Sequence, residues 1–256
     1  MIEETQEKKR IFLRVAYDGT DFHGWQVQPN ARSVEGELNK AIYEMTGEEI
    51  AVIGASRTDA GVHGMGNVAV FDTTSSIPAE KFMYALNTKL PEDVSVVESK
   101  EVAADFHPRH CDSIKTYEYR FYISEVNNPL KRRNAYRIQN KPDIGLMNKA
   151  AAILVGEHDF KSFCSVHTSA ETTVRKLYSA EAFEDGNDIV IRVSGAGFLY
   201  NMVRIIAGTL LDVGNKKYEP EHIKEILEGC DRTLAGPTLE PQGLTLKSIV
   251  FPDMEK

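Results

Sequence analysis

The sequence predicts an α+β fold built from two similar halves. Its hydrophobic residues repeat with a period of two in some segments and of about 3.6 in others, and this alternation of strands and helices returns in the second half. No flexible linker separates the halves, so we expect a continuous, mainly antiparallel sheet or a shared cleft rather than two separate domains. We expect a charged tail at residues 1–10, an N-terminal subdomain at 11–108 and a C-terminal subdomain at 109–256.

The first half should contain several strands and two main helices. The expected strands are residues 11–19, 49–56, 67–73 and 94–103. Ser33 is expected to cap a helix whose apolar face repeats at helical spacing from Val34 to Met45. A second helix should follow Pro78, since proline is tolerated in a first helical turn, and should end before Pro91.

The second half repeats this alternation. The expected strands are residues 115–123, 174–183, 188–195 and 244–251. Asp185-Gly186 is a hairpin signal between the second and third of them. Helices are expected at 144–155 with Asp143 as its cap, at 199–214, and near Pro220.

Composition indicates a globular protein that works in a reducing compartment. The chain of 256 residues is 42% hydrophobic, and no apolar run reaches the length of a membrane span. The N-terminal residues are charged and lack the apolar segment of a signal peptide. Cys111, Cys164 and Cys230 lie far apart and outside any CxxC pair, which favours reduced thiols and a cytoplasmic location.

The net charge of −8 lowers the expectation of a nucleic-acid partner without excluding one. The charge is uneven: residues 1–110 hold 11 Lys/Arg and 18 Asp/Glu, whereas residues 111–256 hold 19 and 20. Because binding depends on the local field, a basic cleft is compatible with an acidic protein.

The segment GASRTDAGVHGM (residues 54–65) is the main candidate site. Its glycines make it poor material for a helix or strand interior, so its polar residues are expected on a tight turn. The simplest interpretation is a surface ion pair between Arg57 and Asp59, which would contribute about 0–1 kcal/mol. A functional interpretation draws on Arg204, alone on an apolar helix, because a buried arginine requires an acidic partner. Pairing with Arg204 would keep the Asp59 carboxylate ionised, as a nucleophile requires.

Two other segments carry aromatic or basic side chains. KTYEYRFYI (115–123) is typical of a half-buried strand, and most of its rings should pack in the core. One ring at the edge of a site could still hold an unstacked base. KRRNAYR (131–137) is more typical of a solvated loop than of a contact to a nucleic-acid backbone.

A metal site is not expected. HPRHC (107–111) contains histidine and cysteine, but no second ligand cluster with metal spacing follows it. Phosphate-binding, nucleophile-elbow and zinc-protease motifs are also missing from the sequence.

Several blocks of the sequence resemble the tRNA pseudouridine synthase A family. GASRTDAGVHG resembles its catalytic loop, and five further blocks agree in order, together spanning residues 11–251. They are YDGTDFHGWQVQP (17–29), KTYEYRF (115–121), GEHDFKSF (156–163), GFLYNMVRIIAGTLL (197–211) and AGPTLEPQGLTL (235–246). His110-Cys111 and the low basic content depart from the family's pattern.

The resemblance implies two ferredoxin- or RRM-like halves with helices on one face and an RNA-binding cleft between them. It implies that Asp59 is the catalytic aspartate and that Arg204 is its ion-pair partner. It further implies that Tyr117 packs against the target uracil and that Arg57 occupies the place of the displaced base. The implied substrate is uridine at positions 38, 39 and 40 in the anticodon stem-loop of tRNA. The implied assembly is a homodimer that needs neither cofactor nor metal.

The sequence leaves alternatives open at three points. Asp59 either attacks C1′ of the ribose or abstracts a ribose proton on the way to a glycal-like intermediate. The substrate is alternatively another set of tRNA positions, such as 27 and 28, or small nuclear RNA. A non-catalytic RNA-binding module with a similar sheet is the hypothesis from a different class, and it predicts no dependence on Asp59.

Overall fold

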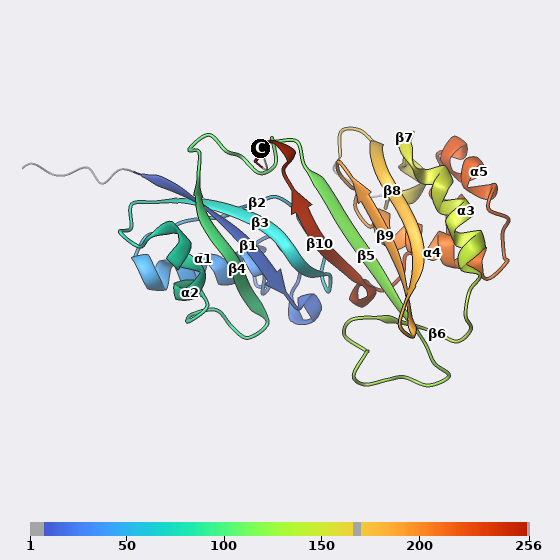
Figure 1. The fold of residues 1–256 in the computed structure, drawn as a ribbon, viewed down its shortest axis with the longest axis horizontal. Coiled ribbons are helices and arrows are strands. Elements are labelled where there is room, and N and C mark those ends of the chain that lie inside the picture. Colours follow the sequence, from blue (N-terminus) through green and yellow to red (C-terminus); the bar gives the residue numbers. More distant parts are fainter. Residues whose placement is uncertain (1–7, 166–169, 255–256) are drawn as a thin grey trace, which may run out of the picture. The chain divides into compact units, whose positions relative to one another are not determined.

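The computed structural model describes residues 8–165 and 170–254 (Figure 1). The chain forms two compact units, Met1–Asp112 (unit 1) and Ser113–Lys256 (unit 2). Each unit contains helices and mainly antiparallel strands, so the predicted α+β class is confirmed. The predicted similarity of the two halves and the cleft between them stay predictions.

The sheet of unit 1 has the strand order β4–β1–β3, and all its pairings are antiparallel. Its strands are β1 (Lys9–Tyr17), β2 (Ile53–Gly54), β3 (His63–Thr73) and β4 (Val94–Val102), with β2 paired to β3. In the central strand, Leu13 lies opposite Ala69 of β3 and Ser99 of β4. This register places the alternate apolar residues of β1 on the face that the helices cover.

Two helices cover that face of the unit 1 sheet, α1 (Val34–Thr46) and α2 (Phe82–Leu86). The Ser33 Oγ accepts the Gly36 N–H at 3.2 Å, which confirms the predicted cap. Leu38 of α1 and Phe82 of α2 are fully buried in the same cluster as Leu13. Burial of these apolar side chains, more than helix propensity, stabilises a helix as short as α2.

The sheet of unit 2 has the order β10–β5–β9–β8–β7, with the short strand β6 added parallel to β5. Its strands are β5 (Ile114–Ile123), β6 (Tyr136–Ile138), β7 (Gly156–Asp159), β8 (Val174–Asp185), β9 (Asp188–Gly195) and β10 (Leu244–Val250). Asp185 pairs with Asp188 across a two-residue turn, and Gly186 has a φ of +61°. The predicted hairpin is therefore confirmed, since a turn of this kind needs a residue that tolerates positive φ.

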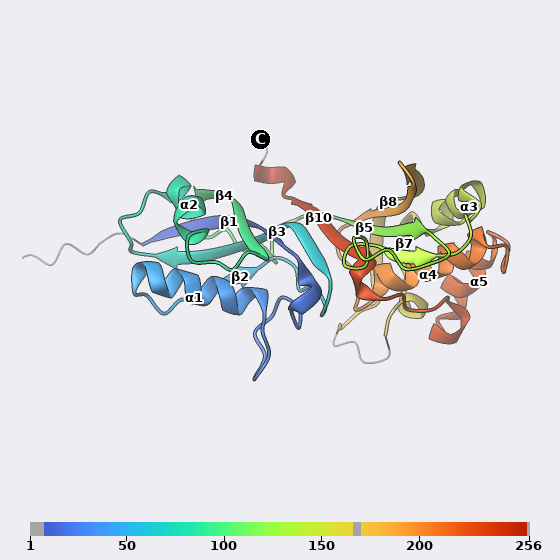
Figure 2. The same ribbon diagram turned by 90° about the horizontal axis from the view of Figure 1, so that it is seen from below.

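Three helices lie together in unit 2, as Figures 1 and 2 show. They are α3 (Ile144–Leu154), α4 (Met202–Gly214) and α5 (His222–Gly229). The Asp143 carboxylate accepts the Leu146 N–H at 3.0 Å, as predicted for a cap. Short 3-10 turns occur at Gly19–Asp21, Ala79–Lys81, Lys161–Phe163, Arg232–Leu234, Pro241–Gly243 and Pro252–Met254. None of the helices in the described part of the chain has the length and apolar content to cross a bilayer.

The structure corrects three sequence predictions. The strand expected at 49–56 is reduced to Ile53–Gly54, because the Val52 N–H donates to the Asn39 side chain of α1 instead of to a strand. The helix after Pro78 is broken into a 3-10 turn and the five residues of α2. The basic segment 131–137 was expected to be a loop, but its end forms β6.

Candidate active site

The loop between β2 and β3 is fixed by backbone hydrogen bonds to the segment that follows β1. The Thr58 carbonyl accepts the Trp25 N–H at 3.0 Å, and the Gly61 N–H donates to the Phe22 carbonyl at 3.2 Å. The Val62 N–H closes a turn onto the Asp59 carbonyl at 3.1 Å. These bonds hold the backbone on both sides of Asp59, which explains how a segment without regular structure keeps one conformation.

Two glycines allow this close approach. A Cβ at Gly24 would lie 2.7 Å from the Thr58 carbonyl oxygen, and Gly24 has a φ of +96°. A Cβ at Gly19 would lie 2.0 Å from the carbonyl oxygen of Val62. The block YDGTDFHGW thus supplies the surface on which the loop between β2 and β3 rests, a function that its sequence alone did not reveal.

The glycines of the loop itself serve different purposes. Gly61 has a φ of +76°, as a tight turn requires. Gly54, Gly64 and Gly66 instead lie within β2 and β3, so the expectation that the segment avoids strand interiors is wrong at its two ends. The reason is packing: a Cβ at Gly64 would lie 2.5 Å from the ring of Tyr17.

A buried polar network supports the loop from beneath. The hydroxyl groups of Tyr17 and Thr58 are hydrogen-bonded at 2.7 Å. The Asn67 amide donates to the Ser56 carbonyl at 3.0 Å and to the Tyr17 oxygen at 3.3 Å. Asn67 is 0% exposed and Thr58 is 6% exposed, whereas Asp59 is half-buried. The Thr58 side chain is therefore turned inward, whereas its neighbour Asp59 is only half-buried.

Arg57 is exposed and forms no salt bridge with any residue that the structure describes, Asp59 included. The surface ion pair between these two residues is therefore excluded. Arg109 lies close to Arg57, and its Nε donates to the Gly54 carbonyl at 2.7 Å. Burial lowers the pKa of the Arg109 guanidinium, and the positive charge of Arg57 lowers that pKa further. Two positive charges therefore act on the same end of the loop.

In unit 2, Tyr117 lies on β5 between Leu246 of β10 and Val193 of β9. Its ring packs edge-on against Phe198, with the centroids 5.0 Å apart. Tyr117 is 7% exposed, whereas Tyr119 on the same strand is 0% exposed. The prediction that most rings of this strand belong to the core is confirmed.

Arg204 lies on the first turn of α4 and is half-buried. Its Nε donates to the Leu239 carbonyl at 2.6 Å, and one Nη donates to the Asn201 Oδ1 at 2.7 Å. Asn201 has a φ of +62°, and its own Nδ2 donates to the Ser165 hydroxyl at 2.7 Å. Two neutral acceptors thus fix the direction of the guanidinium. No sequence signal marked Asn201 as one of them.

Tyr119 connects Arg204 to the rest of β5. Its hydroxyl donates to the Glu240 carbonyl at 2.6 Å, next to the Leu239 carbonyl that holds Arg204. Burial raises the pKa of the Tyr119 phenol strongly, and the charge of Arg204 opposes this only in part. Gly243 allows the contact, since a Cβ there would lie 2.6 Å from the Tyr119 ring.

The structure thus places Arg57 and Asp59 on one loop of unit 1, and Tyr117 and Arg204 in unit 2. Within unit 2 it brings Arg204 beside Tyr119, two residues from Tyr117. The ion pair between Asp59 and Arg204 stays a prediction.

The remaining sequence candidates have other contacts. In the segment 131–137, Lys131 pairs with Asp188 and Arg137 donates to the carbonyls of Ser124 and Glu125. In the segment 107–111, the rings of His107 and His110 stack with centroids 3.8 Å apart. Over residues 8–165 and 170–254, no three His, Cys, Asp or Glu residues are grouped as metal ligands.

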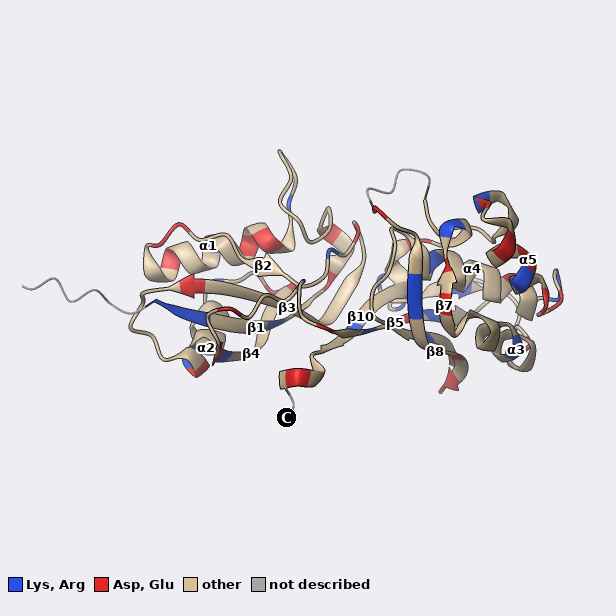
Figure 3. Ribbon diagram, turned by 90° about the horizontal axis from the view of Figure 1, so that it is seen from above, with Lys and Arg blue, Asp and Glu red and all other residues tan. Residues whose placement is uncertain are grey.

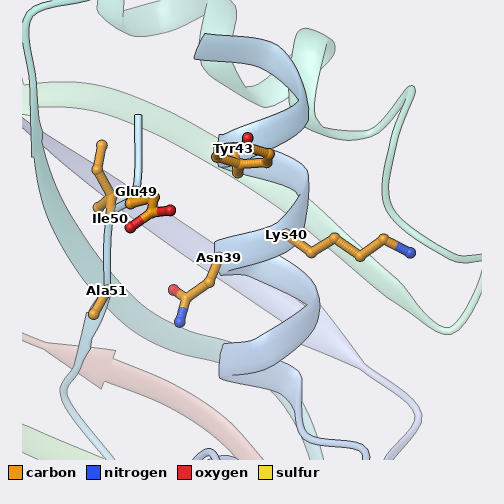
Figure 4. A pocket seen from close by; sticks show the side chains of 6 residues that line it. All are labelled: Asn39, Lys40, Tyr43, Glu49, Ile50 and Ala51. Atoms are coloured by element: carbon orange, nitrogen blue, oxygen red, sulfur yellow. The ribbon is translucent and has the colours of Figure 1, made fainter. Parts of the chain in front are cut away.

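A shallow hollow in unit 1 lies apart from these side chains (Figure 4). It lies between α1 and the chain before β2, and its lining residues are Asn39, Lys40, Tyr43, Glu49, Ile50 and Ala51. None of the predicted site residues lines it, so we do not assign the reaction to it.

The described residues thus form an α+β fold in which backbone hydrogen bonds fix a loop that carries the half-buried Asp59. Comparison with known proteins identifies the family of the chain. A model of the tRNA pseudouridine synthase family matches residues 14–110 and 150–252. The tRNA pseudouridine synthase A of Syntrophomonas wolfei is 44% identical over 247 residues, which cover 96% of this chain and 99% of that protein.

The proteins of the same name from Caldicellulosiruptor bescii and Geobacter sp. are 44% and 43% identical, cover 95% and 96% of this chain, and are themselves covered completely. The chain therefore belongs to the tRNA pseudouridine synthase family. It is an isomerase that acts on tRNA and converts uridine to pseudouridine.

Proposed function

We propose that the enzyme modifies uridine at positions 38, 39 and 40 in the anticodon stem-loop of tRNA, with Asp59 as the catalytic carboxylate. The observation that carries the proposal is the loop around Asp59, where buried neighbours and backbone hydrogen bonds fix the chain while Asp59 itself is only half-buried. The family resemblance of the RTDAGVH segment supplies the role of Asp59 and the tRNA positions.

In the proposed reaction the N1–C1′ bond of uridine breaks, the uracil turns, and C5 bonds to C1′. The C5 proton is then lost and N1 gains a proton, so that all atoms are conserved in the product. Asp59 either attacks C1′ or removes a ribose proton. In both routes an ionised carboxylate at a site with little water is required.

Arg57 and Tyr117 are proposed to handle the base. A target base in a helix must first leave the stack, at a cost of a few kcal/mol. Arg57 is exposed and has no salt-bridge partner among the described residues, so it is available to enter the vacated place. Tyr117 would hold the free uracil by stacking, so that the base turns without leaving.

Arg204 is proposed to pair with Asp59 and keep it ionised. Asn201 and Leu239 hold two of its nitrogen atoms, and the other Nη donates to no acceptor among the described residues of unit 2. We also propose that the enzyme works as a homodimer in the cytoplasm, where its tRNA substrate is found.

A map of pseudouridine in tRNA from a strain that lacks the enzyme tests the assigned positions. Mass spectrometry should find uridine at 38, 39 and 40 and unchanged pseudouridine elsewhere. Restoration by the wild-type gene, but not by a gene that carries Asp59→Asn, completes the test. Loss of pseudouridine at other tRNA positions instead, such as 27 and 28, would show that the enzyme modifies those positions and not 38, 39 and 40.

A further inference from the structure

Most contacts between arginine and carboxylate in this protein serve the fold. In the described part of the chain, at least five arginines have a carboxylate oxygen within 2.6–2.9 Å, and these include Arg10, Arg14, Arg32, Arg120 and Arg192. For Arg10, Arg32 and Arg192, the hydrogen bond to the carboxylate is the main cause of a raised pKa. These side chains are neutralised within the protein.

Arg175 on β8 differs from this group. It is half-buried, and one Nη donates to the carbonyls of Thr172 at 2.9 Å and Val174 at 2.6 Å. Over residues 8–165 and 170–254, no carboxylate lies within salt-bridge distance of it. Burial lowers the pKa of its guanidinium, and the Cys164 side chain, which is not a carboxylate, opposes that effect only in part. The positive charge of Arg175 is therefore not balanced within the described chain.

The N–H groups of Arg175 that donate to no described acceptor are suited to bind a phosphate. A guanidinium has five N–H donors in a planar fork, and its paired edges bind two oxygens of a phosphate at once. Neither Nε nor the second Nη of Arg175 donates to any described acceptor. Gly197 lies beside Nε, and a Cβ there would be 3.9 Å away, so a larger side chain at this position would cover the edge.

The position of Arg175 relates it to the proposed uracil site. Gly197 is followed by Phe198, whose ring packs against Tyr117 with the centroids 5.0 Å apart. The basic residues of β8 are Arg175 and Lys176, and Figure 3 shows basic residues in blue. Arg175 and Tyr117 are thus linked through two successive residues, Gly197 and Phe198, and an RNA strand whose base lay against Tyr117 would bring its backbone phosphates to this part of unit 2.

We infer that Arg175 binds a phosphate of the tRNA backbone through its Nε–Nη edge, next to the nucleotide that Tyr117 holds. This inference rests on the proposed role of Tyr117 at the target base. Because a phosphate contact reads no base, it supports action at neighbouring positions of one stem-loop. The opposing hypothesis is that Arg175 only ties the start of β8 to the Thr172 carbonyl.

The salt dependence of tRNA binding separates these hypotheses. The dissociation constant of unmodified tRNA is measured between roughly 50 and 200 mM salt for wild type, Arg175→Gln, Arg175→Lys and the control Arg120→Gln. Arg120 is a suitable control because it is a strand arginine that is already paired with Asp185 and Asp188.

Arg175→Gln should weaken binding and make the slope of log affinity against log salt shallower by about 0.7–0.9, the contribution of one phosphate. Arg120→Gln should keep the wild-type slope. Arg175→Lys should keep the slope, because the charge remains, but bind more weakly than wild type, because the fork is lost. A wild-type slope for Arg175→Gln overturns the inference, whatever happens to thermal stability. If Arg175→Gln does not fold, wild-type affinity of Arg175→Lys overturns it instead.

Release of tritium from uracil C5 is measured on the same preparations and tests the proposed function separately. Wild-type enzyme that releases tritium, together with an unchanged slope for Arg175→Gln, overturns only the phosphate contact. Wild-type enzyme that binds tRNA and releases no tritium overturns the proposed function. A shallower slope for Arg175→Gln would still support the contact in that case.

Discussion

In unit 1, Asp59 lies on a loop whose position depends on backbone hydrogen bonds and on glycines that leave room for them. In unit 2, Tyr117 lies on a strand and Arg204 lies on a helix. Side-chain and carbonyl acceptors there fix only the end of the Arg204 side chain. Because of this difference, the two units should respond differently to mutation. The unit 1 site should fail when the backbone is displaced, whereas the unit 2 site should weaken gradually as single acceptors are removed.

The largest effect is expected for Asp59→Asn, which keeps the size of the side chain and removes its charge. The rate of pseudouridine formation should fall by at least about a thousandfold, as for the loss of a catalytic nucleophile. Binding of tRNA should change little, because the carboxylate is not expected to contact phosphate. A variant with appreciable residual turnover would remove Asp59 from its assigned role.

A smaller but still large loss is expected for Gly24→Ala. Its new Cβ would lie 2.7 Å from the Thr58 carbonyl oxygen, and its φ of +96° disfavours alanine. Displacement of the loop should lower turnover by roughly ten- to a hundredfold, since a misplacement of about 1 Å can cost 10²-fold.

Gly47→Ala is the matched control, because it introduces alanine at a positive φ without a steric clash. Gly47 also has a positive φ, +74°, but a Cβ there meets nothing within 4 Å. It should lose about 1 kcal/mol of stability and keep wild-type turnover. Equal losses of turnover in the two variants would show that the loop does not depend on the clearance at Gly24.

In unit 2, Asn201→Gly should reduce turnover by about three- to tenfold, in line with the roughly 0.5–1.5 kcal/mol net contribution of one typical hydrogen bond. The substitution removes the oxygen that holds Arg204, and glycine accepts the φ of +62° without strain. Asn201→Asp keeps an acceptor for Arg204 and should show a different pH–rate profile, because its charge competes for the guanidinium. Identical profiles for wild type and Asn201→Asp would contradict this positioning role.

Among the site variants, the smallest effect on turnover is expected for Tyr119→Phe. This variant should lose about 1–2 kcal/mol of unfolding free energy, because the Glu240 carbonyl loses its donor. Burial raises the folded-state pKa of this phenol above its ordinary value of 10.0. The stabilising contribution is therefore fully present below pH 10 and is lost as the pH rises above it, where the unfolded state releases the proton first. Denaturant titrations at pH 9 and 11 should show a smaller pH dependence for the variant than for wild type.

The sequence predicted those features that depend on local chemistry. The caps at Ser33 and Asp143 and the hairpin at Asp185-Gly186 are confirmed because each requires only a few neighbouring residues. The expected helix at 199–214 begins at Met202, because Asn201 takes a left-handed conformation and turns its side chain to Arg204. Nothing in the local pattern signals that conformation.

Features that depend on distant segments were not predicted. The surface beneath the loop between β2 and β3 combines Gly19 and Gly24 with carbonyls about 35–45 residues away, and these segments meet only when β1 and β3 pair. The polar network of Tyr17, Thr58 and Asn67 also joins segments that lie far apart in the sequence. The pairing of Asp59 with Arg204 was suggested by a lone arginine on an apolar helix, whereas the catalytic role of Asp59 and the roles of Arg57 and Tyr117 came from the family resemblance. All of them stay predictions.

The central claim is that the Asp59 carboxylate drives isomerisation of uridine in tRNA. Its most direct test is incubation of unmodified tRNA that carries tritium at uracil C5 with wild type and with Asp59→Asn. We predict stoichiometric release of tritium from the target uridines by wild type and none above background by the variant. Equal release by both proteins, or none by folded wild type that binds the tRNA, would contradict the account.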